Sequence, residues 1–155
     1  MNEATRILKT TSNANDGGET FLTPRLIRFS DVDPAGIAYY PRIHNIIHEA
    51  FEDLFEEYIG ERYYHVLQKQ HIGFPMVHTE IDFVSPLHFG DRAQVKVNCF
   101  KLGKSSIGLR YRIELNGRIC VDARTTVVCI STKTMKSIAL TDNWRECFKR
   151  IMAPL

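Results

Sequence analysis

The sequence predicts an α+β fold in which one curved antiparallel sheet wraps around a single long central helix, followed by a C-terminal helix. Three observations support this prediction. A long amphipathic helical pattern runs over residues 39–59, several runs that alternate apolar and polar residues follow it, and an Asn-Gly pair at 116–117 marks a hairpin between two of these runs. A sheet with one apolar face has to bury that face, and the long helix can cover it.

The first forty residues predict a tail, a strand and a loop. Residues 1–20 are polar and rich in Asn, Thr and Gly, which predicts a flexible N-terminal tail, and residues 21–155 then form a single domain. A first short strand is expected at 23–29. The stretch that follows contains Asp, Pro and Gly, which are typical of turns.

The central helix shows the strongest pattern in the chain. Apolar residues recur at helical spacing on one face: Ile43, Ile46, Ile47, Ala50, Phe51, Leu54, Phe55, Tyr58 and Ile59. Pro41 suits the first turn, where its missing N–H costs nothing, and Gly60 is a suitable stop. A shorter amphipathic helix is expected at 61–70.

The rest of the chain predicts strands and a last helix. Alternating runs are expected to form strands at 77–83, 93–99, 107–115 and 118–130. Asp142 can cap a C-terminal helix that carries Trp144, Cys147, Phe148 and Ile151.

Composition excludes several classes of function. The 155 residues suit one domain, and 20 basic against 18 acidic side chains predict neither a nucleic-acid nor a membrane partner. The N-terminus lacks an apolar signal segment, and no apolar run approaches the ~18 residues of a membrane helix, so we expect a cytoplasmic protein. The four cysteines form no C-x-x-C pair and are expected to be free thiols without a metal site.

Three segments resemble the 4-hydroxybenzoyl-CoA thioesterase family. FSDVDPAGIAYYPRIHN, at 29–45, is similar to the family signature that precedes its helix. IDFVSPLHFGD, at 81–91, is similar to its strand-and-turn segment, and LGKSSIGLRYRI, at 102–113, to its next hairpin. The resemblance covers about residues 24–140. It implies the hotdog fold and an acyl-CoA thioesterase.

The resemblance also implies the catalytic residues. Asp33 matches the catalytic carboxylate, and Tyr40 matches the residue whose backbone N–H stabilises the oxyanion. A helix N-terminus suits a developing negative charge, and Asp33 could act as nucleophile or as general base. Gly36, Ile37 and Tyr39 are expected to contact the substrate. Asp31 is interpreted as a turn-forming residue.

Two histidines of the central helix depart from the family pattern. His44 and His48 fall within the apolar arc, so they either lie at its edge with hydrogen-bond partners or line the acyl pocket. Many family members carry a carboxylate where this chain has His48. The HEAFE sequence from His48 onward is more similar to dihydroxynaphthoyl-CoA thioesterases. Another branch of hotdog thioesterases uses a helix glutamate, which makes Glu49 an alternative carboxylate.

Cations near the site would suit the phosphates of coenzyme A. Lys104 and Ser105 match the nucleotide-proximal turn of the family, although a solvated hairpin tip explains them equally well. Arg110 and Arg112 are secondary candidates.

Substrate and partners are also inferred from the resemblance. We expect an aromatic acyl-CoA, similar to 4-hydroxybenzoyl-CoA, with dihydroxynaphthoyl-CoA or a short- to medium-chain acyl-CoA as alternatives. No cofactor is needed, because coenzyme A is part of the substrate. A homodimer or homotetramer is expected, with the site at a subunit interface. The alternative from another class is a non-catalytic acyl-CoA-binding protein. The dehydratase signatures H-F-P-G and N-P-x-H do not occur.

Overall fold

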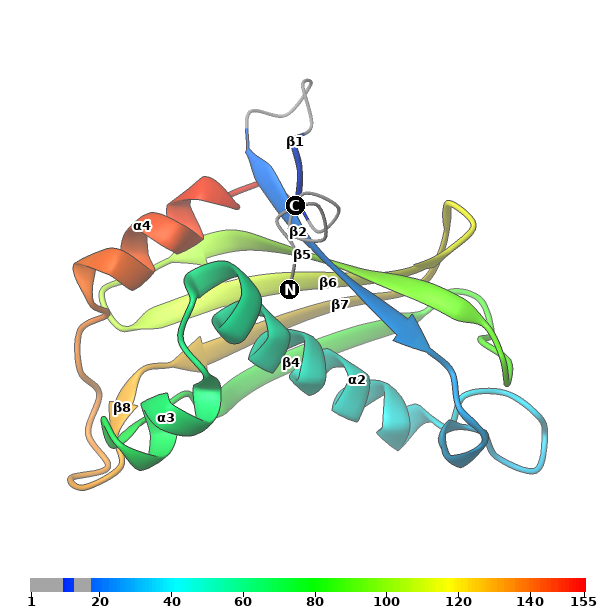
Figure 1. Ribbon diagram of the computed structural model, residues 1–155, viewed down its shortest axis with the longest axis horizontal. Helices are drawn as coiled ribbons and strands as arrows, with labels where there is room; N and C mark the ends of the chain where they lie inside the picture. The colour runs from blue at the N-terminus through cyan, green and yellow to red at the C-terminus, as the bar shows by residue number, and fades with distance from the viewer. Residues whose placement is uncertain (1–9, 13–17) are drawn as a thin grey trace.

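The computed structural model describes residues 10–12 and 18–155 and shows a curved sheet wrapped around a helix (Figure 1). The sheet has six strands in the order β1-β2-β5-β6-β7-β4, and all neighbouring strands are antiparallel. A separate two-stranded sheet pairs β3 with β8. This is the α+β architecture that the sequence predicts.

The elements have the following bounds. The strands are β1 (Thr10–Ser12), β2 (Glu19–Leu26), β3 (Ile72–Gly73), β4 (Met76–Phe83), β5 (Arg92–Leu102), β6 (Ser106–Leu115), β7 (Arg118–Val128) and β8 (Ile130–Ser131). The helical elements are the 3-10 turn η1 (Phe29–Asp31), α2 (Tyr40–Asp53), the π-helical turn η2 (Leu54–Ile59), α3 (Tyr63–Gln68) and α4 (Asp142–Arg150).

Helix α2 buries the predicted apolar face against the sheet. Its buried residues are Ile43, Ile46, Ile47, Ala50 and Phe51. The predicted helix at 39–59 is not α-helical throughout, because its last six residues form η2. There the N–H of Gly60 donates to the carbonyl of Phe55 at 2.9 Å, and Gly60 ends the element with φ 88°. The wider turn keeps Leu54 and Phe55 buried before the chain reverses.

An aromatic cluster closes the C-terminal end of this helical segment. The fully buried ring of Phe55 lies 5.2 Å from that of Phe74 and 5.7 Å from that of Trp144. Phe148 of α4 completes the cluster at 6.3 Å. The indole N–H of Trp144 donates to Glu61 at 2.9 Å, so this polar atom also has a partner. Helix α4 therefore covers the end of the core that α2 leaves open.

Strand β4 differs from the other long strands because it is exposed on both faces. Alternate residues of β5, β6 and β7 are buried, as the sequence pattern predicts. In β4 only Ile81 is half-buried, and every other residue is exposed. β4 is also an edge strand, since it pairs only with β7 in the described sheet. This edge presents unpaired backbone groups.

The sheet begins earlier than the sequence predicts. Residues 1–9 and 13–17 of the predicted tail lie outside the described residues, whereas Thr10–Ser12 and Glu19–Thr20 are strand residues that pair with one another. The first long strand is accordingly 19–26 rather than 23–29. Backbone pairing with β5 explains this shift, because it extends to Phe21 on the N-terminal side.

The four cysteines are buried free thiols, as predicted. Burial raises the pKa of the Cys99 and Cys129 thiols to about 11. None of the helices in the described ranges is long and apolar enough to cross a membrane.

Candidate active site

Asp33 lies in a tight loop between η1 and α2. Its backbone N–H donates to the carbonyl of Ile37 at 3.0 Å, and its carbonyl accepts the N–H of Gly36 at 2.9 Å. Gly36 has φ 81°, a left-handed conformation that favours glycine. The Oδ1 atom of Asp33 accepts the N–H of Ala35 at 2.8 Å. One oxygen therefore holds the loop, and Oδ2 has no hydrogen-bond partner among the described residues.

The loop is tied to the connection between β4 and β5. The N–H of Ala38 donates to the carbonyl of Leu87 at 2.8 Å, and Ile37 forms an isolated antiparallel bridge with His88. Asp33 is thereby held beside residues 83–87, which are distant in the sequence. This contact brings together two of the three segments that resemble family motifs, those at 29–45 and 81–91.

The start of α2 leaves one backbone donor free. Between residues 38 and 43, Pro41 has no N–H, and four others donate to backbone carbonyls: Ala38 to Leu87, Tyr39 to Asp31, and Arg42 and Ile43 to Tyr39. The N–H of Tyr40 has no acceptor in the part of the chain that the structure describes. Tyr39, which precedes the helix, provides no side-chain cap. A free donor at a helix N-terminus favours a negatively charged ligand atom.

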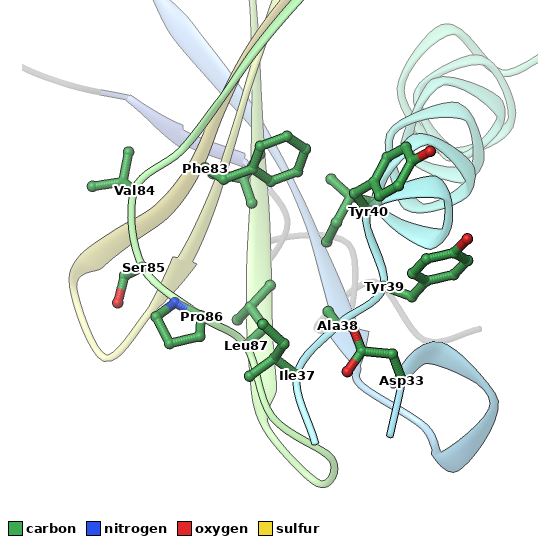
Figure 2. A pocket seen from close by; sticks show the side chains of 12 residues that line it. Asp33, Ile37, Ala38, Tyr39, Tyr40, Phe83, Val84, Ser85, Pro86 and Leu87 are labelled. Atoms are coloured by element: carbon green, nitrogen blue, oxygen red, sulfur yellow. The ribbon is translucent and has the colours of Figure 1, made fainter. Parts of the chain in front are cut away.

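Asp33 and Tyr40 line the same pocket, which has a volume of about 520 Å³. Figure 2 shows Asp33, Tyr39 and Tyr40 on one side of this pocket and Val84, Ser85 and Pro86 across from them. The lining residues are Asp33, Ile37, Ala38, Tyr39, Tyr40, Ile43, Phe83, Val84, Ser85, Pro86, Leu87 and Val121. Asp33 is the one charged residue among them.

The pocket combines three features that acyl hydrolysis requires. A carboxylate can attack a carbonyl carbon or activate water, and a free backbone N–H can stabilise the oxygen that becomes negative. The apolar lining can hold the acyl group. The pocket is open, since Tyr40 is 60% exposed and Phe83 is 56% exposed.

The predicted site residues divide into two groups. Asp33, Ile37, Tyr39 and Tyr40 line the pocket, and Gly36 shapes the loop without lining it. A side chain at Gly36 would meet no atom within 4 Å, so its backbone angle is what the loop requires.

The two histidines of α2 are exposed, although the helical wheel places them in the apolar arc. Neither lines the pocket. The ring of His48 stacks on Phe51, with 6.2 Å between the centroids, and its Nε2 lies 3.1 Å from Glu52 Oε1. His48 thus contacts a ring and a carboxylate of its own helix. His44 lies on the same exposed edge, because a position at the border of the arc turns toward solvent.

Lys104 and Ser105 belong to the hairpin between β5 and β6, which lies at the other end of the sheet from the loop between η1 and α2 (Figure 1). The carbonyl of Lys104 accepts the N–H of Leu140 at 3.0 Å, and that of Ser105 accepts the N–H of Cys129 at 2.7 Å. Within one chain this hairpin is not part of the pocket. Strand β5 explains the separation, since it spans the sheet between the two sites.

Arg110, Arg112 and Glu49 make their polar contacts outside the pocket. Arg110 donates through Nε and Nη2 to Asp122 at 2.9 and 2.6 Å, and Arg112 donates to Asn98 at 3.2 Å. Glu49 lies 3.6 Å from Arg25 of β2 and does not line the pocket.

Sequence reasoning missed one wall of the pocket and one ion pair. Residues 83–87 were interpreted only as a strand end and a turn, although the family-like segment at 81–91 was a usable signal. Asp31 is not simply a turn residue, because it is buried and paired with Arg42. Nothing in the local pattern around Arg42 indicated this contact.

The chain matches known proteins over most of its length. Residues 27–148 match a family described as the thioesterase-like superfamily. A 1,4-dihydroxy-2-naphthoyl-CoA hydrolase of Crocosphaera subtropica is 32% identical over 119 residues, which cover 75% of this chain and 86% of that protein. Another, from Synechococcus elongatus, is 29% identical over 122 residues, which cover 79% of this chain and 90% of that protein.

Solved structures match as well. The crystal structure of a 1,4-dihydroxy-2-naphthoyl-CoA thioesterase from Synechocystis has a TM-score of 0.77 at 26% identity, covering 84% of this chain and 96% of that one. The structure of a thioesterase-superfamily protein from Jannaschia has a TM-score of 0.80 at 25% identity and covers 92% of this chain and 98% of that one. The matched family region, 27–148, contains both the loop of Asp33 and residues 83–87.

Proposed function

Because this chain belongs to the thioesterase-like superfamily, we propose that its pocket hydrolyses the thioester of an acyl-CoA. Its fold is the hotdog fold and its enzyme class is that of a thiolester hydrolase, as the sequence predicts. One observation carries the proposal of a site. A carboxylate, Asp33, and the acceptor-free N–H of Tyr40 line a single apolar pocket.

The proposed reaction can follow two routes. Oδ2 of Asp33 attacks the thioester carbonyl, the oxyanion binds the N–H of Tyr40, and loss of the coenzyme A thiolate leaves a mixed anhydride that water cleaves. Alternatively, Asp33 takes a proton from water, which attacks the carbonyl directly. Both routes give the free acid and coenzyme A, with water as the only co-substrate and no cofactor.

We propose an aromatic acyl group, and 1,4-dihydroxy-2-naphthoyl-CoA as the first substrate to test. Two curated relatives and one solved structure that are similar to this chain carry this name. A volume of about 520 Å³ lies within the range of small-molecule pockets, and Tyr39, Tyr40 and Phe83 offer ring faces for stacking. 4-Hydroxybenzoyl-CoA, which the sequence motifs favour, has a smaller ring and is the second substrate to test.

The proposed partner is another copy of this chain, joined along β4. This strand is an exposed edge, and its last residue, Phe83, forms part of the pocket wall. Pairing two β4 strands would satisfy the free backbone groups and cover the adjacent opening. Light scattering should give at least twice the chain mass of 17.9 kDa. Val77→Lys, which adds a charge to the exposed strand, should weaken the assembly. A wild-type monomer would contradict this arrangement.

The function is tested by measuring thiol release from dihydroxynaphthoyl-, 4-hydroxybenzoyl-, benzoyl-, butyryl- and decanoyl-CoA. We expect hydrolysis of an aromatic substrate and a loss of about 100-fold or more in Asp33→Asn. Glu49→Gln is the matched control, because it makes the same change outside the pocket and should keep its rate. Binding without hydrolysis of any substrate would favour the ligand-binding alternative. An active Asp33→Asn would exclude the assigned carboxylate.

A further inference from the structure

We propose that the ion pair between Asp31 and Arg42 positions the Asp33 carboxylate relative to the Tyr40 N–H. This inference rests on the function proposed above. It assigns two positioning residues to the reaction, neither of which lines the pocket.

Asp31 contacts three residues around the site. Asp31 as a whole is only 8% exposed. Oδ2 accepts the N–H of Arg28 at 2.8 Å, and Oδ1 accepts Nε and Nη2 of Arg42 at 3.2 and 3.0 Å. Its backbone carbonyl accepts the N–H of Tyr39 at 2.8 Å. A buried carboxylate is costly unless it is paired, so these contacts hold it in one place.

These contacts span the two catalytic groups. Asp31 lies two residues before Asp33, whereas Tyr39 and Arg42 flank Tyr40 in the sequence. The intervening loop is closed by its own bonds, from Asp33 to Ile37 and through the bridge of Val32 with Ala38. The loop thus has its own internal bonds, and the contacts of Asp31 with Tyr39 and Arg42 join its start to the first turn of α2.

Charge gives a second reason for the pair. Arg42 is a cation in the first turn of α2, where the positive end of the helix dipole disfavours it. Asp31 neutralises it, so that Asp33 remains the one charge that faces the pocket. Loss of either partner would leave an uncompensated charge directly behind the site.

The same helix offers a matched control at its other end. Arg25 Nη2 of β2 lies 3.0 Å from Asp53 Oδ2, the same distance that joins Arg42 Nη2 to Asp31 Oδ1. Asp53 is the last residue of α2 and also accepts the Thr23 hydroxyl at 2.7 Å. This pair fastens α2 to the sheet without touching the loop of Asp33.

The experiment compares Asp31→Asn, Arg42→Gln and Arg42→Lys with Asp53→Asn, Arg25→Gln and Arg25→Lys. For each, kcat and KM are measured with the best acyl-CoA substrate well below the melting temperature. We expect kcat to fall about tenfold or more in Asp31→Asn and Arg42→Gln, with KM changed less than about threefold, because small misplacements of reacting groups cost large factors. Arg42→Lys keeps the charge and should lose less.

A double variant separates a joint role from two independent ones. Asp31→Asn combined with Arg42→Gln should be no slower than the slower single variant, since the pair acts as a unit. The control variants should lower the melting temperature but keep kcat within about twofold. Hydrogen exchange of residues 33–40 should increase in Arg42→Gln and not in Asp53→Asn, and this readout does not depend on activity.

Two results would overturn the proposal: kcat within about twofold of wild type in folded Asp31 and Arg42 variants, or equal losses in the control pair. If Asp31→Asn does not fold, the two Arg42 variants decide, because that side chain is more exposed. Failure of the proposed function differs from both, as wild type would then hydrolyse no acyl-CoA or Asp33→Asn would stay active. In that case unchanged hydrogen exchange in Arg42→Gln overturns the positioning role.

Discussion

Helix α4 begins with a side-chain cap, whereas helix α2 begins without one. The hydroxyl of Thr141 accepts the N–H of Trp144 at 3.2 Å in the first turn of α4. Tyr39 provides no such bond to α2, and the N–H of Tyr40 has no acceptor in the described ranges. A capped terminus uses its donors for stability. An uncapped terminus keeps a donor for a ligand, and at α2 this donor shares a pocket with the Asp33 carboxylate.

The surroundings of the two termini differ in the same way. The rings next to α4 are buried and contact one another, as Phe55 contacts Trp144 and Phe148. Next to the start of α2, Tyr40 and Phe83 remain exposed around an open pocket. The apolar side chains beside α4 are thus buried by contacts within the chain. The apolar side chains beside the start of α2 remain available to contact a substrate and, as proposed, a second copy of the chain.

The largest effect is expected at the closed end. Phe55→Ala should lower the free energy of unfolding by about 3–5 kcal/mol, because it empties the centre of the aromatic cluster. Urea denaturation measures this loss. Phe83→Ala is the control at the open end and should change stability by less than about 1 kcal/mol while raising KM. Equal destabilisation by both changes would mean that the two ends do not differ in this way.

The next effect concerns the free donor itself. Tyr40→Pro removes the N–H but suits the first helical position, and Tyr39, at ψ 128°, has the extended backbone that a following proline prefers. We expect kcat to fall about 100- to 1000-fold. Tyr40→Ala removes the same side chain but keeps the N–H, so its rate should be much closer to wild type. Comparable rates in the two variants would remove Tyr40 as oxyanion donor.

A smaller effect is expected at the capped terminus. Thr141→Ala removes the acceptor for Trp144 and should cost about 1 kcal/mol of stability, measured by chemical denaturation. Thr141→Ser keeps the hydroxyl and serves as the control. Neither change should alter kcat at a temperature where the protein is folded. A reduced kcat would show that α4 influences the pocket.

The smallest expected effect is a pH dependence of the free energy of unfolding, caused by the buried Cys129 thiol. The Cys129 thiol has its pKa raised from 9 to about 11 by burial, so the unfolded chain loses this proton first as pH rises. The stabilisation is complete below pH 9 and is lost between about pH 9 and 11. At pH 9 the loss is below about 1 kcal/mol for this thiol. Cys129→Ala should remove that part of the difference between unfolding free energies measured at pH 7 and 9.

Much of the fold could be predicted because its signals are local. The apolar repeat from Ile43 to Phe55 and the alternation in β5–β7 each report which face of an element is buried. The predicted helix over 39–59 was wrong at its end, because residues 54–59 keep the same apolar face while adopting a wider turn. Hydrophobic spacing does not distinguish these two kinds of turn over so few residues.

The site was predictable in part. Asp33, Ile37, Tyr39 and Tyr40 lie in one contiguous motif, so their common location follows from chain continuity. Lys104 and Ser105 were chosen by motif position, and their separation from Asp33 depends on where an entire strand leads. The placement of His44 and His48 at the edge of the apolar arc was ambiguous, because a helical wheel gives direction but not the extent of the neighbouring surface.

By itself, the sequence determined the order of the long elements, the buried faces of α2, β5, β6 and β7, and the turn at Gly36, since side-chain spacing and glycine act over a few positions. Only the tertiary structure decided which wall faces Asp33 and which cation pairs with Asp31. The bond from Ala38 to Leu87 and the contact of Arg42 with Asp31 join surfaces whose meeting depends on the path of the whole chain. Local sequence patterns do not predict such contacts, because their energy arises only when segments distant in the sequence pack together.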